Sequence, residues 1–70
     1  HFDYQISNVI YPVNAEAKSV ESAKILGNFL EVPKNLVRPS KQAFYASIIL
    51  GHDYKKIVNL LDKYIAAQKN

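Results

Sequence analysis

Two stretches of the chain carry apolar residues at the three-to-four spacing of an amphipathic helix. The clearer stretch follows Asp53, and its apolar face comprises Tyr54, Ile57, Val58, Leu61, Tyr64 and Ile65. The earlier stretch begins after Asn14 and ends near Leu30, before Pro33. Its stripe comprises Val20, Ala23, Leu26, Gly27 and Leu30. These periodicities predict two helices, each with one side on a core.

Two other stretches have the length and composition of β-strands. Residues 4–11 alternate imperfectly, are rich in β-branched and aromatic residues, and are closed by Pro12. Residues 43–50 form a continuous apolar run bounded by turn residues, which is typical of a strand covered on both faces; a short buried helix is the alternative. Residues 31–42 carry two prolines among polar and basic residues, so we expect a connection there, with room for a brief extended piece.

The order strand, helix, connection, strand, helix predicts an α/β fold for residues 1–70. We expect a small βαβα unit in which a parallel strand pair carries the two amphipathic helices, because parallel neighbours need a long crossover. Residues 44–50 are expected to form the central strand. Both strands then end at one edge of the sheet, where open α/β folds usually bind ligands.

The candidate binding residues lie in the two loops that follow the predicted strands and in the first turn of the last helix. They are Tyr11, Asn14, His52, Asp53, Lys55 and Lys56. Asn14 and Asp53 are also candidate helix N-caps, beside helix N-termini that favour anionic groups. Since Asp53 would itself occupy the amides that it caps, we expect the Asn14 end to make the main contact.

Composition restricts the classes of function. A formal charge of +3 is spread along the sequence and indicates a solvated surface, with modest, salt-sensitive attraction from the lysines after Asp53. The chain has no cysteine and only two histidines, which argues against a disulfide framework or a structural zinc site, and we expect no cofactor. The neighbouring side chains of His52 and Asp53 rarely converge on one point, and no phosphate-binding loop or nucleophile motif is present. We therefore expect a non-catalytic protein.

Several segments together resemble the LytR C-terminal domain family. They are Phe2-Asp3-Tyr4, Val9-Ile10-Tyr11, the alanine- and leucine-containing helix around 23–30, and Ala46-Ser47-Ile48-Ile49-Leu50-Gly51-His52-Asp53-Tyr54. The closing Leu-Gly-x-Asp-Tyr is the most specific part. The resemblance covers nearly the whole chain and the later two thirds of the usual domain. The family's opening strand, with its Val-x-Val-x-Asn-Gly pattern, and its first helix have no counterpart here.

This resemblance implies a compartment and a class of ligand. Such domains are appended to bacterial cell-envelope proteins, including LytR-CpsA-Psr transferases, so it implies an extracytoplasmic module of the envelope or periplasm that binds peptidoglycan or an attached glycopolymer. No apolar run approaches the length of a membrane span, and membrane association is expected only through an anchor in a parent chain. The chain begins with His1, so we expect it to be part of a longer protein. The family has no agreed catalytic residues to transfer to this chain.

Two alternatives stay open. A structural or assembly domain would use its sheet edge for self-association, and a homodimer is expected because a two-stranded sheet is seldom stable alone; strand exchange is one route. Three helices near 15–30, 40–50 and 53–67 would instead suit a helix-turn-helix protein, but the second would be too apolar to read bases, and no nucleic acid is expected.

Overall fold

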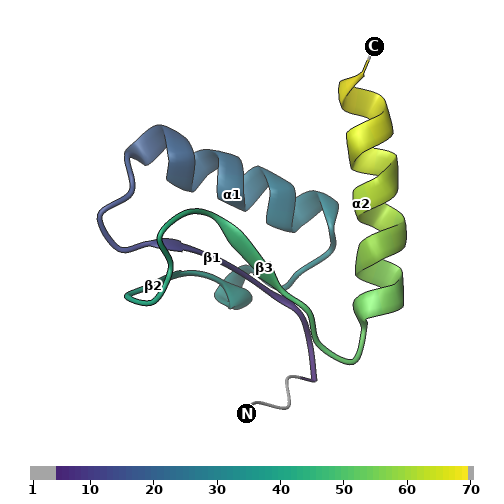
Figure 1. The fold of residues 1–70 in the computed structure, drawn as a ribbon, viewed down its shortest axis with the longest axis horizontal. Coiled ribbons are helices and arrows are strands. Elements are labelled where there is room, and N and C mark those ends of the chain that lie inside the picture. Colours follow the sequence, from purple (N-terminus) through teal and green to yellow (C-terminus); the bar gives the residue numbers. More distant parts are fainter. Residues whose placement is uncertain (1–4, 70) are drawn as a thin grey trace.

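The computed structural model describes residues 5–69, in which a three-stranded mixed sheet carries two helices (Figure 1). The elements are β1 (Asn8–Pro12), α1 (Ala17–Phe29), the short 3-10 helix η1 (Lys34–Leu36), β2 (Val37–Ser40), β3 (Ser47–Ile49) and α2 (Tyr54–Gln68). The predicted α/β fold, with a parallel strand pair and two helices, is confirmed. Tyr4, where the first strand was expected to begin, and the Phe2-Asp3-Tyr4 segment of the family resemblance lie outside the described residues.

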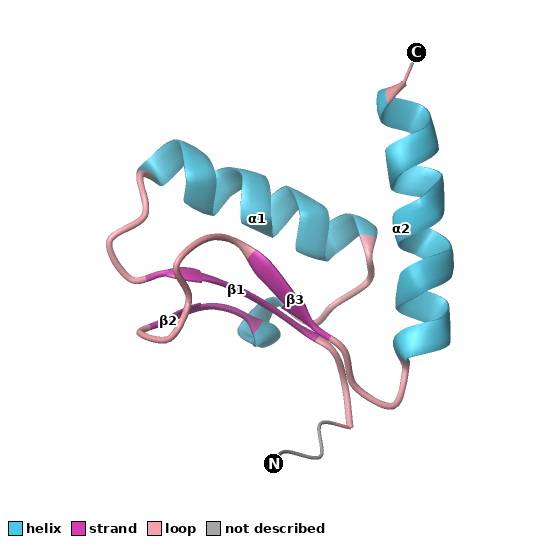
Figure 2. Ribbon diagram, viewed as in Figure 1, coloured by secondary structure: helices cyan, strands magenta, loops and turns pink. Residues whose placement is uncertain are grey.

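The strand order is β2-β1-β3, so the central strand is β1 (Figure 2). β1 pairs in parallel with β2, with Val9 opposite Val37, and antiparallel with β3, with Val9 opposite Ile48. The prediction that residues 44–50 form the central strand, parallel to the first, is therefore wrong. The parallel partner comes instead from the predicted connection, and α1 is the crossover that leads to it.

Two local features explain this error. Pro39 lies inside β2, where an edge strand tolerates a proline because the missing N–H need not join the ladder. The apolar run at 43–50 contributes only three residues to β3, while Phe44 and Tyr45 before them are 90% and 74% exposed. An apolar run of strand length thus contains an exposed loop followed by a short edge strand. The helix-turn-helix alternative, which requires a helix near 40–50, is excluded by the same observation.

The core lies between β1 and the helices. Its buried cluster comprises Val9, Tyr11, Ala23, Leu30, Val32 and Ile57. Alternation along β1 directs Val9 and Tyr11 to this side. On the other side, both polar atoms of the buried Asn8 amide have a partner: its Nδ2 donates to the Ile6 carbonyl at 2.9 Å, and its Oδ1 accepts from Arg38 Nε at 3.1 Å. This arrangement joins β1 to β2 through side chains as well as through the backbone ladder.

The ends of α1 differ from those expected. Its N-cap position is Glu16, which makes no side-chain cap, and Asn14 lies exposed in the preceding turn, so the prediction that Asn14 caps this helix is wrong. At the C-terminus, Glu31 has a positive φ of 62°. The N–H of Glu31 donates to the Asn28 carbonyl, and the N–H of Val32 donates to the Gly27 carbonyl. These two bonds form a Schellman motif, in which Glu31 occupies the position where glycine is usual. The turn directs Val32 into the core.

Gly27 sets the distance between α1 and β2. A Cβ atom at this position would overlap Cγ2 of Val37, which is a short β-branched side chain with little freedom to move away. Gly27 is also buried. The absence of a side chain at one helical position therefore lets α1 lie close against the edge strand.

We predict that Gly27→Ala destabilises the protein by about 1 kcal/mol. Alanine gains about 1 kcal/mol in helix propensity over glycine, but overpacking against Val37 costs about 1–3 kcal/mol. Urea unfolding followed by circular dichroism measures the difference. The exposed Ser22→Ala in the same helix is the control and should not destabilise. Stabilisation by Gly27→Ala would show that α1 does not depend on this close approach.

Candidate functional site

The six predicted binding residues do not form one site. Because β3 runs antiparallel to β1, the loop after β3 lies at the beginning of β1 and not at its end. Tyr11 and Asn14 are therefore at one end of β1, while His52 and Asp53 are at the other. The predicted rim rested on two parallel strands ending together, and that geometry is absent between these strands. That any one of these residues contributes to binding by itself stays a prediction.

Asp53 occupies the N-cap position of α2 but makes no side-chain cap there. Its Oδ1 instead accepts two hydrogen bonds from Ser7, one from the backbone N–H at 2.9 Å and one from Oγ at 2.7 Å. The Ser7 Oγ in turn accepts from the N–H of Gly51 at 2.8 Å. The predicted capping role is thus wrong, because the carboxylate serves a contact between residues far apart in the sequence.

The Ser7–Asp53 contact is structural. Ser7 is inaccessible to solvent, so its hydroxyl cannot meet a substrate. Its hydrogen bonds fix the start of α2 against the segment that enters β1, and the backbone N–H of His52 adds a bond to the Gln5 carbonyl at 3.2 Å. The Asp53 carboxylate is therefore engaged by Ser7, and it does not compete with an anionic ligand that binds elsewhere on the surface.

The two lysines proposed to attract an anionic ligand differ in their contacts. Lys56 Nζ lies 3.1 Å from Glu31 Oε1, and both side chains are more than half exposed. An exposed pair of this kind contributes roughly 0–1 kcal/mol. Lys55 is exposed on α2, as is His52 in the turn before it. These residues lie beside the start of α2, away from the Tyr11 end of β1.

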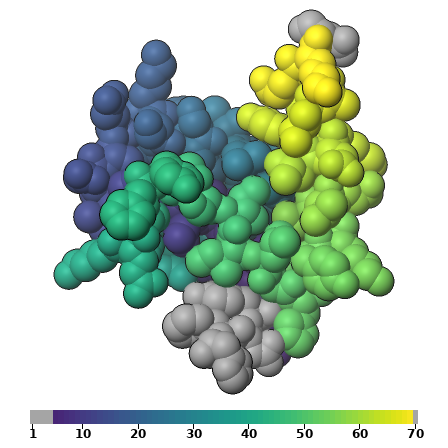
Figure 3. Space-filling view, in the orientation of Figure 1, coloured from purple at the N-terminus to yellow at the C-terminus, as the bar shows by residue number. Residues whose placement is uncertain are grey.

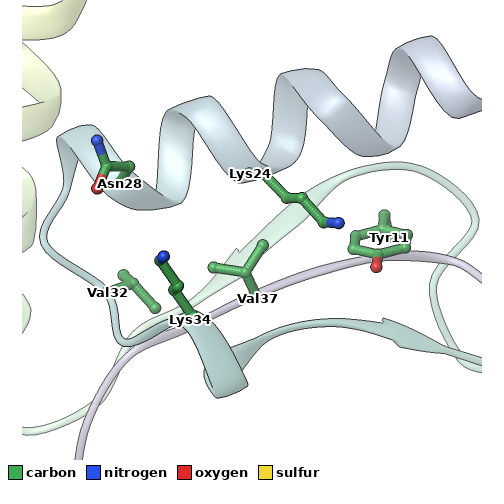
Figure 4. A pocket seen from close by; sticks show the side chains of 6 residues that line it. All are labelled: Tyr11, Lys24, Asn28, Val32, Lys34 and Val37. Atoms are coloured by element: carbon green, nitrogen blue, oxygen red, sulfur yellow. The ribbon is translucent and has the colours of Figure 1, made fainter.

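A groove of about 700 Å³ opens between α1 and the sheet on the β2 side. It is lined by Tyr11, Lys24, Asn28, Val32, Lys34 and Val37 (Figure 4). Tyr11 comes from the central strand and Lys24 and Asn28 from α1. Val32 and Lys34 come from the chain between α1 and β2, and Val37 is the first residue of β2. Tyr11 is thus the one predicted binding residue that lines this groove.

The groove has an apolar floor and polar, basic sides. Val32 and Tyr11 are nearly buried and supply the floor. Figure 4 shows Lys24 extending along α1 toward Tyr11 and Lys34 rising from η1 toward α1. Lys24 and Lys34 are exposed, and within residues 5–69 neither makes an ion pair. Two ammonium groups and an amide over a floor of valine and tyrosine side chains suit a ligand that carries anionic groups on a sugar-sized body.

Neither a known relative nor a metal site or a membrane helix indicates what this protein does. No family model, curated protein or solved structure matches the chain. Within the part of the chain that the structure describes, no three His, Cys, Asp or Glu residues are grouped so that they could hold a metal ion. No helix between residues 5 and 69 has both the length and the apolar character needed to cross a bilayer.

Sequence reasoning missed Lys24, Asn28 and Lys34. Lys34 lies in the expected connection, and the other two residues lie outside the apolar stripe predicted for the first helix. Only the position of β2 beside β1 brings these residues together. A signal was nevertheless present, because a glycine on the apolar stripe of a helix, as at Gly27, indicates close approach to another element at that point.

We predict that Ser7→Ala and Asp53→Ala each destabilise the protein by about 1–3 kcal/mol, because each leaves buried hydrogen-bonding groups unpaired. The double variant should lose less than the sum, with a coupling of about 0.5–3 kcal/mol, since both substitutions remove the same contact. Urea unfolding measures all three variants, and the exposed Asn59→Ala in α2 is the control. Additive losses would indicate that Asp53 acts on α2 independently of Ser7.

Proposed function

We propose that this domain is a non-catalytic binding module of the bacterial cell envelope. Its ligand is peptidoglycan or an anionic glycopolymer attached to it, and the site is the groove between α1 and β2. The observation that supports this proposal is the pair of lysines on the sides of an apolar-floored groove. That chemistry supports the ligand class, and the sequence resemblance to the LytR C-terminal domain family supports the compartment.

The charges favour a polymer with repeated anionic groups. Lys24 and Lys34 approach the groove from different elements, so one extended ligand could contact both ammonium groups along its length. Lysine binds phosphate or carboxylate as a flexible point charge, and exposed pairs of this kind are weakened by salt. The Asn28 amide can both donate to and accept from sugar hydroxyls. Binding should therefore be of modest affinity at each groove and should decrease as ionic strength rises.

A structural or assembly role is the second candidate. The exposure of Phe44 and Tyr45 in the loop between β2 and β3 supports it, because large exposed apolar groups often mark protein contacts. This role does not require the two groove lysines. The two candidates are therefore separated by substitutions in the groove.

We predict that the double variant Lys24→Gln, Lys34→Gln is retained on purified sacculi about tenfold or more less tightly than the native domain at low salt. The reason is that two contacts of about 1 kcal/mol each are lost. Glutamine keeps the helix propensity and most of the side-chain length while it removes the charge. The measurement is a co-sedimentation isotherm with sacculi, carried out with and without the attached polymers. Loss of retention after the polymers are removed would identify the polymer and not the peptidoglycan as the ligand.

The matched control is Lys18→Gln, Lys41→Gln, which removes the same charge from exposed positions that do not line the groove. Equal weakening by both pairs would show that binding depends only on net charge and would contradict the groove as the site. If the native domain is not retained at low salt, the binding proposal fails and the assembly role is the better account.

A further inference from the structure

The apolar face of α2 extends beyond the part of it that packs against the other described elements. Ile57 is buried in the core, Leu60 and Leu61 pack partly against it, and Tyr64 meets the ring of Phe29 edge-on at 5.2 Å between centroids. Tyr54, Val58 and Ile65 lie about 60–100° around the helix from Ile57. All three are between 43% and 47% exposed. Figure 3 shows the C-terminal turns of α2, in yellow, projecting from the remaining surface.

This exposed flank, together with the half-buried Leu61, has the spacing of a coiled-coil seam. Tyr54, Val58, Leu61 and Ile65 follow one another at intervals of four, three and four residues, which are the d, a, d and a positions of a heptad. The a positions carry valine and isoleucine and the d positions carry tyrosine and leucine, so every position of this heptad stripe is apolar. We call these four residues the α2 seam.

The surface area of the chain also points to an uncovered contact. The chain exposes 5402 Å² at a mass of 7.9 kDa. A folded monomer of this mass is expected to expose about 4,400 Å². The surplus, about 1,000 Å², is close to the roughly 800 Å² that each partner contributes to a stable interface of standard size. The exposed apolar side chains of Tyr54, Val58 and Ile65 form part of the surface that a second copy would cover.

The charged residues beside the α2 seam favour antiparallel over parallel pairing of two copies. Lys55 and Asp62 occupy the e positions beside the α2 seam. In an antiparallel pair, e positions face e positions, so Lys55 of each protomer would lie beside Asp62 of its partner. The same register places Tyr54 against Ile65 and Val58 against Leu61, in both directions, and leaves no seam residue without a partner. A parallel pair would place Lys55 and Asp62 beside the apolar g positions, Ile57 and Tyr64, without charge complementarity.

We propose that the protein is a two-fold dimer in which the α2 seams of two copies pack antiparallel. The interface is isologous and closes on itself, because each seam residue contacts its counterpart reciprocally. The projecting C-terminal turns of one α2 lie along the Tyr54 end of the other. This interface uses a helix face and leaves the strand edges free, unlike the sheet-edge association expected from the sequence.

The first test exchanges the charges. Lys55→Asp and Asp62→Lys should each raise the dimer dissociation constant about tenfold, because each creates two like-charge pairs by symmetry. The two substitutions in one chain should restore the native value to within about threefold. Sedimentation equilibrium over about a thousandfold range of concentration gives the constants, and circular dichroism checks the fold. Lys63→Asp, an exposed charge reversal away from the seam, is the control and should have little effect.

The second test determines direction and register. The chain contains no cysteine, so the variant Tyr54→Cys, Ile65→Cys can form disulfides only at these positions. The two positions of one helix are about 16 Å apart and cannot bridge within a protomer. Mild oxidation should yield a covalent dimer in which position 54 of one protomer is joined to position 65 of its partner, as tryptic peptide mapping would reveal. Bridges between like positions would overturn the antiparallel arrangement.

A folded monomer at all concentrations would overturn the proposal. A dimer that is unaffected by Val58→Glu, Ile65→Glu would also overturn it, because such a dimer must use another surface, such as a sheet edge. Both side chains are nearly half exposed, so these substitutions leave the core intact. The exposed apolar Ile25→Glu on α1 controls for the added negative charge and should leave the dimer unchanged.

Discussion

The pairing of β1 on both edges is the constraint on which the rest of the structure depends. Four of its five residues are buried, and Val9 lies opposite a residue of each neighbouring strand while it also faces the core. Both neighbours are therefore edge strands, of only four and three residues, and one contains Pro39. Short edges interrupted by proline are poor templates for further strand pairing. This makes a helix face a better surface for self-association than the sheet.

The helices were predictable from sequence because their periodicity extends over several turns. Both lie within two or three residues of the expected ranges. The strands were less predictable because their pairing is set by contacts outside each segment. The run at 43–50 is apolar throughout, but apolarity alone does not distinguish a buried strand from an exposed aromatic loop that leads into an edge strand. The segment Val37–Ser40 contains a proline and an arginine, which indicate a connection unless its position at the sheet edge is known.

The same limit applies to individual side chains. An aspartate before an amphipathic helix favours a capping role, which is a local inference about neighbouring residues. Asp53 instead accepts hydrogen bonds from Ser7, 46 residues earlier in the chain. Only the antiparallel pairing of β3 with β1 brings the two together, so an error in strand direction also changes the role assigned to the carboxylate. The expected binding rim failed for the same reason, and the groove lysines were missed because β2 was missed.

The groove and the α2 seam lie on different parts of the surface. Groove residues come from β1, α1, β2 and the chain that leads into β2, whereas the seam belongs entirely to α2. A dimer through the seam would use none of the residues that line the groove, and its two-fold axis would relate the two grooves. Two weak sites on one rigid body can bind a repeating polymer far more tightly than either alone, provided that the polymer spans the distance between them. Self-association and modest, lysine-based recognition would then be complementary, because the dimer supplies the avidity that a single exposed groove lacks.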